Sequence, residues 1–177
     1  MKITSKVLLF SLAASLTFFA CKKSKSNNTQ TVTTQDRAFI SKASLSNTAE
    51  VRAGALADST SDSSVVRAFG QQMVTDHSTA QTDLKTLGSN LSVAVTDSVD
   101  SMHAALIDTL RGLSGRMFDS VYIMNQIKDH QTAITDFQNE INEGNQSDVV
   151  GYANKYLPKL QMHLQMADSI ASLMKFK

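Results

Sequence analysis

The sequence of 177 residues has a single cysteine, a single proline and no tryptophan. Because Cys21 is the only cysteine, no disulfide can form within the chain, even in an oxidising compartment. Runs of β-branched residues are also scarce. Apolar residues instead recur three and four positions apart over long stretches, which is the spacing of amphipathic helices. The sequence therefore predicts an all-α protein.

A charge excess of one sign is also lacking. Residues 35–177 contain 12 Lys and Arg residues and 16 Asp and Glu residues, which leaves a net charge of −4 and no basic face for nucleic acid. The chain has no Gly-rich phosphate loop and no Ser-His-Asp order with a supporting signature. These absences favour a non-catalytic protein over an enzyme.

Residues 1–21 have the pattern of a lipoprotein signal peptide. Lys2 and Lys6 precede the apolar residues 7–19, and Ala20 precedes Cys21. The apolar stretch is shorter than the about 20 residues of a transmembrane helix. We therefore expect acylation of Cys21 and a periplasmic protein of the bacterial envelope, anchored by its lipid to the outer membrane. The alternative is an ordinary secretory signal, since Phe18 fits the lipoprotein pattern weakly.

The mature chain divides into a tether and one domain. Residues 22–34 contain one aliphatic residue, Val32, and cannot bury enough surface to offset the entropy of ordering, so they predict a flexible linker. Residues 35–177 have the length of one compact domain. No feature of the sequence identifies a protein partner.

Four long helices and one short helix are predicted in the domain. The long helices are expected at about 36–59, 63–88, 116–143 and 147–177, with Gly88 ending the second and Pro158 bending the last. A short helix at 99–113 falls in the long connection between the second and third. This order predicts a ferritin-like four-helix bundle with an extra helix in that connection. The alternative is an up-down bundle with a fifth helix across one end.

An internal repeat points to the bundle core. Residues 69–84 align without a gap on residues 122–137 at an offset of 53, which places Asp76 on Asp129 and His77 on His130. A repeated Asp-His pair within an apolar helical pattern places histidines where the core is expected.

Each long helix has one metal-binding residue type on its inward stripe, namely Glu50, His77, His130 and His163. Each lies about 14 or 15 residues into its predicted helix, roughly 21 Å from the start, so all four are expected in one layer. Three imidazoles and a carboxylate predict a single site for Zn²⁺, Cu²⁺, Mn²⁺ or Fe²⁺. The alternative is a buried cluster of hydrogen bonds that also uses partners such as Asn47, Gln126 and Tyr122.

Residues around this layer restrict its chemistry. A di-iron centre is disfavoured, because the positions three residues before the histidines are Val74, Ile127 and Leu160 rather than carboxylates. Methionines near the layer, including Met73, raise copper as an option, although methionine is more often core filler. Asp76 and Asp129 are candidates to orient the ligands. His103, on the short helix, is expected to be exposed.

A set of short motifs resembles the domain of unknown function 4142 family, over about residues 35–173. These motifs are Asp36-x-x-Phe39, Glu50-Val51, Gly54-x-Leu56-Ala57, Phe69-x-x-x-Met73-Val74-x-Asp76-His77, Leu113-Ser114-Gly115-x-x-Phe118-Asp119, Asp129-His130 and Leu157-Pro158-x-Leu160-x-x-His163-Leu164. The resemblance implies export and a ferritin-like bundle; members are often labelled outer membrane proteins. It implies no activity.

The sequence therefore predicts a lipid-anchored helical bundle of unknown activity, with a candidate site for one metal ion in its core. Two alternatives remain open: a periplasmic metalloprotein with redox or stress-protective activity, and an envelope interaction module without metal.

Overall fold

The computed structural model describes residues 30–176, and their regular structure is entirely helical. The long helices are α1 (Thr34–Thr60), α2 (Ser64–Leu91), α4 (Gly115–Glu143) and α5 (Ser147–Met174), and the short helix is α3 (Ser101–Arg111). The predicted all-α class is confirmed.

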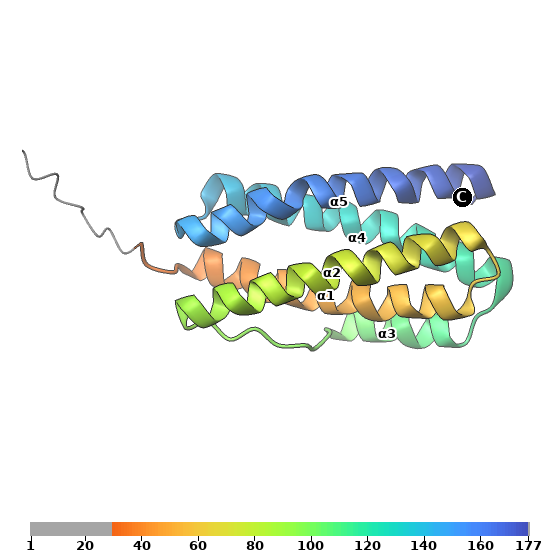
Figure 1. Ribbon diagram of the computed structural model, residues 1–177, viewed down its shortest axis with the longest axis horizontal. Coiled ribbons are helices and arrows are strands. Elements are labelled where there is room, and N and C mark those ends of the chain that lie inside the picture. The colour runs from red at the N-terminus through yellow and green to blue at the C-terminus, as the bar shows by residue number, and fades with distance from the viewer. Residues whose placement is uncertain (1–29, 177) are drawn as a thin grey trace, which may run out of the picture.

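Two antiparallel hairpins, α1–α2 and α4–α5, pack side by side (Figure 1). After α2 ends, residues 92–100 and α3 run back along the bundle, so α4 starts at the end where α2 started and runs parallel to it. α3 lies along α1 and α4 rather than across one end. This long crossover is the ferritin-like connection, and the up-down arrangement does not apply.

Side-chain caps fix most helix starts close to their predicted positions. The Thr33 side chain accepts from Asp36 N and the Asp36 carboxylate accepts from Thr33 N, a capping box that starts α1 two residues earlier than predicted. Gly88 does not end α2, which continues to Leu91. A Cβ at Gly88 would lie 2.6 Å from the Val93 carbonyl oxygen, so this glycine permits a close chain crossing instead.

The hairpin α1–α2 is packed tightly through two glycines. A Cβ on either Gly54 or Gly70 would lie 2.7 Å from the carbonyl oxygen of the other, so only glycine permits this approach. No helix among residues 30–176 is both long and apolar enough to cross a membrane.

The core consists of two apolar clusters separated along the bundle axis. One is built around Phe69 and Phe118 and the other around Phe39 and Phe137, whose rings meet edge to face with centroids 4.9 Å apart. Along α2, α4 and α5 the positions between the two clusters are occupied by histidines. The apolar clusters therefore shield a polar layer from both ends.

Candidate metal centre

Three histidines from three helices meet in the polar layer. His77 of α2, His130 of α4 and His163 of α5 are each at most 3% exposed. One nitrogen atom from each ring lies within 4.8 Å of the others. The structure thus brings together three of the four residues that the sequence places in one layer.

The hydrogen bonds of the three rings determine which nitrogens carry protons. His130 Nδ1 lies 2.9 Å from the Gln126 carbonyl oxygen, and His77 Nδ1 lies 3.0 Å from Asn47 Oδ1. His163 Nε2 lies 2.9 Å from the Asp76 carboxylate. All three partners are acceptors, so these ring nitrogens must donate. In the neutral rings the other nitrogen of each histidine then keeps its lone pair.

These lone pairs point into the triangle. His130 Nε2 and His163 Nδ1 lie 3.3 Å apart, and His77 Nε2 is buried with no hydrogen-bond partner in the part of the chain that the structure describes. Burial lowers the pKa of His130 and of His163 to about 4, and that of His77 well below its usual value. All three rings are therefore neutral at pH 7, which is the form that binds a metal.

Asp76 fixes His163 and is itself held by two further side chains. Lys159 Nζ lies 2.5 Å from its second carboxylate oxygen, and the Gln72 amide donates to the oxygen that His163 uses. Burial raises the pKa of Asp76, but the hydrogen bonds from Lys159, Gln72 and His163 outweigh it and bring the value to about 2. Asp76 thus holds the His163 ring through a hydrogen bond, and its role in orienting a metal ligand stays a prediction.

Glu50 lies outside the triangle, on the Nδ1 side of His130. Its carboxylate is 3.8 Å from His130 Nδ1 and accepts a 2.6 Å hydrogen bond from the Gln126 side chain. Burial raises the pKa of Glu50 to about 7, against the effect of the Gln126 hydrogen bond. The carboxylate therefore faces the protonated edge of the ring rather than the lone pairs.

The other predicted residues are distributed around the bundle. Asp129 faces His103 at 4.0 Å and not the triangle, so its orienting role is not supported by this geometry. Met73 is buried in the apolar cluster around Phe69. His103 is partly buried, with a side chain only 13% exposed, and the expectation of an exposed residue was wrong. Cys21 lies outside the described residues.

Lys159 and Gln72 are the residues that sequence reasoning missed. Both bond Asp76. Lys159 precedes His163 by four residues and Gln72 precedes Asp76 by four, so each lies one helical turn before a residue of the site. A charged or amide side chain one helical turn from a polar core residue is the sequence feature that could have identified both.

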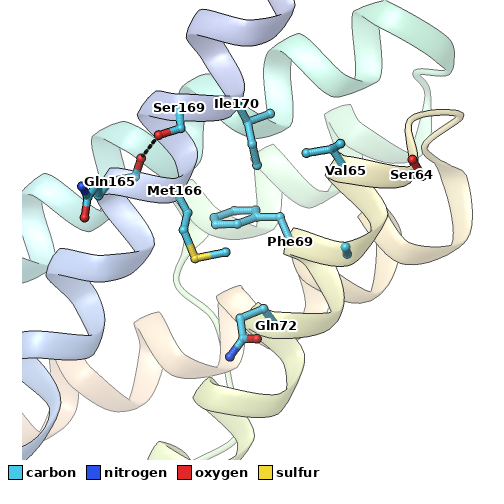
Figure 2. A pocket seen from close by; sticks show the side chains of 9 residues that line it. Ser64, Val65, Phe69, Gln72, Gln165, Met166, Ser169 and Ile170 are labelled. Carbon is cyan, nitrogen blue, oxygen red and sulfur yellow. Dashed lines mark hydrogen bonds between the residues drawn. The ribbon is translucent and has the colours of Figure 1, made fainter.

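Two hollows open along the seam between α2 and α5. A cavity of ≈ 10 Å³ is lined by His77, His163, Asp76 and Lys159, and this volume suits about one water molecule. Further along the seam lies an apolar groove of ≈ 610 Å³, where Phe69 of α2 and Met166 of α5 point toward one another (Figure 2). Gln72 lines the groove and donates to Asp76, so it connects the groove to the site.

Comparison with known proteins identifies the family. The family described as domain of unknown function (DUF4142) matches residues 21–170, and the chain belongs to this family. No curated protein matches the chain. A solved structure, the crystal structure of a DUF305 fragment from Deinococcus radiodurans, covers 80% of this chain and 98% of its own, with 12% identity and a TM-score of 0.71. At this identity the likeness shows a shared helical fold.

Proposed function

We propose that this protein is an exported, lipid-anchored helical bundle that binds one transition-metal ion through His77, His130 and His163. The observation that supports the proposal most is the set of three converging lone pairs. Each ring donates its N–H, on the nitrogen that faces away from the triangle, to a carbonyl, an amide oxygen or a carboxylate, as metal-binding histidines usually do.

The donor set favours zinc or copper among the four metals considered. Three neutral imidazoles suit Zn²⁺ and copper, whereas Mn²⁺ prefers oxygen ligands and non-haem Fe²⁺ sites commonly combine two histidines with a carboxylate. Ligand nitrogens in a tetrahedral zinc site are about 3.4 Å apart. The 3.3 Å separation of His130 and His163 is already close to that value, and an inward shift of His77 would complete the set.

The site supports binding more than catalysis. The adjoining cavity of ≈ 10 Å³ leaves space for about one small ligand such as water, and apolar clusters close the layer at both ends. A reaction at the metal would therefore be restricted to ligands of about the size of water.

The test is a melting experiment on protein purified in chelator, with and without added Zn²⁺, copper, Mn²⁺ or Fe²⁺. A ligand that binds only the folded state stabilises it by about 2.7 kcal/mol at a hundredfold excess over its dissociation constant, which raises the melting temperature by several degrees. The variant His130→Gln should lose this increase, whereas the control His103→Gln, outside the triangle, should keep it. A wild type that responds to none of the four metals would leave only a structural cluster of hydrogen bonds.

Membrane anchoring is supported by the apolar segment before Cys21 and by the absence of any other cysteine. Several acyl chains on Cys21 would hold the protein at a membrane, since each buried methylene contributes roughly 0.8 kcal/mol. The variant Cys21→Ser should leave the membrane fraction and lack the acyl mass. Unchanged fractionation without an acyl mass on the wild-type chain would refute the anchor.

A further inference from the structure

A second polar site lies away from the three histidines, on the seam between α1 and α4 at the start of α3. It is a pocket of ≈ 270 Å³ with apolar walls from Phe39, Leu45 and Met102. His103 of α3 and Asp129 of α4 are among the polar side chains that line it. Apolar walls with a few convergent polar groups are typical of sites for small molecules.

His103 and Asp129 face each other across the pocket, and with the ring in its neutral form both offer a hydrogen-bond acceptor. His103 Nδ1 lies 2.9 Å from the Asp100 carboxylate, to which it must donate, so the neutral ring keeps its lone pair on Nε2. That nitrogen faces Asp129 Oδ2 at 4.0 Å. The Asp129 side chain is only 14% exposed and accepts no hydrogen bond from residues 30–176.

The 4.0 Å separation discriminates between possible bridging groups. A nitrogen donor placed about 2.9 Å from both acceptors would see them at an angle of about 90°, which the hydrogens of an ammonium group can serve. A transition metal about 2.1 Å from both would need an angle of about 145°, which neither tetrahedral nor octahedral coordination provides. Without movement of either side chain, a hydrogen-bond donor therefore fits between the two atoms and a metal does not.

The charges of the pocket favour a cation. Asp100, Asp129 and Asp136 line it together with Lys42 and Lys128, and Lys42 is already paired with Asp136 at 2.7 Å. We propose that this pocket binds a protonated primary amine, whose ammonium group bridges Asp129 and His103 and whose short apolar chain lies against Phe39 and Met102. This binding is independent of the three-histidine site.

The test is a calorimetric titration of the protein, kept in chelator, with n-butylammonium. Binding should be detected, and Asp129→Asn should weaken it roughly ten- to hundredfold, the value of a hydrogen bond to a charged group. His103→Phe should also weaken it, and both variants should melt as cooperatively as the wild type. The matched control Asp108→Asn removes an exposed carboxylate of α3 and should bind as the wild type does.

Two further ligands test the chemistry. Tetramethylammonium has the same charge but no N–H donor, and n-butanol has the chain but no charge; both should bind at least tenfold more weakly. Absence of butylammonium binding at millimolar concentration, equal binding of tetramethylammonium, or unchanged binding to Asp129→Asn would each overturn the proposal. None of these results would affect metal binding by the three histidines.

Discussion

The two repeated segments, on α2 and α4, have equivalent partners at Asp83 and Asp136 but different partners two turns earlier, at Asp76 and Asp129. Asp83 pairs with Lys155 of α5 at 2.6 Å, and the aligned Asp136 pairs with Lys42 of α1 at 2.7 Å. α5 therefore faces α2 as α1 faces α4, with Lys155 in the place of Lys42.

The same correspondence places unlike residues opposite the aligned Asp76 and Asp129. Four and eight residues beyond Lys155 are Lys159 and His163, both bonded to Asp76. The same steps beyond Lys42 reach Ser46 and Glu50, which leave Asp129 without a cation from that helix. The repeat supplies His77 and His130 to one layer, but the facing helices decide which aspartate supports it.

The largest difference between the two segments is expected when Asp76 and Asp129 are each replaced by alanine. Asp76→Ala leaves His163, Lys159 and Gln72 without their acceptor, and we expect it to lower the free energy of unfolding by about 3 to 5 kcal/mol. Asp129→Ala removes no hydrogen bond from the described residues and should cost less than about 1 kcal/mol. Urea unfolding at pH 7 in chelator measures both. Equal losses would contradict the assigned difference.

Glu50 takes the place of His163 in this correspondence, and its buried carboxyl should make stability depend on pH. Its pKa is about 7 in the folded protein against 4.5 for an ordinary glutamate, so the folded state holds the proton more tightly. Its contribution is full below pH 4.5 and is lost as pH rises through 7, by up to about 3 kcal/mol. Glu50→Gln removes this loss and should be more stable than the wild type at pH 8 but not at pH 4.

Comparison of Glu50→Gln with the wild type isolates this effect from that of the histidines. The pKa of His130 is lowered from 6.5 to about 4, so its contribution is present above pH 6.5 and lost as pH falls through 4, the opposite direction. Unfolding curves from pH 4 to 8 measure the difference, with the exposed Glu143→Gln as the control. A difference that does not vary with pH would show that Glu50 is not held neutral.

Metal affinity should respond to Asp76 and not to Asp129. If the three histidines bind zinc, Asp76→Asn weakens the partner that orients His163 and should raise the dissociation constant about 10- to 100-fold. Asp129→Asn should leave it unchanged, because its carboxylate faces His103. Competition with a chelator of known affinity measures both constants. An equal effect of the two variants would place Asp129 in the site.

The layer of three histidines could be predicted because helical periodicity and height along a helix depend only on sequence spacing. Those quantities place Glu50 at the correct height but do not specify which edge of the His130 ring it faces, since that depends on how α1 and α4 pack. The partial burial of His103 depends likewise on where the crossover brings α3. Gly88 is a poor guide to the end of α2, because a glycine that ends a helix and a glycine that permits close contact between two chain segments cannot be told apart from the sequence.

The smallest expected effect comes from giving Asp129 the cation that Asp76 has. Ser46 corresponds to Lys159 and lines the same pocket as Asp129. Ser46→Lys should therefore bring an ammonium group to this carboxylate and stabilise the protein at pH 7 by about 0.5 to 1 kcal/mol, the value of a partly exposed ion pair. Ser46→Met, of similar length without charge, is the control. The gain should vanish in an Asp129→Asn background, as a double-mutant cycle would measure.

The same lysine would occupy the proposed amine site and should abolish butylammonium binding. A stabilised variant that still binds the amine would show that the ion pair and the ligand site are separate.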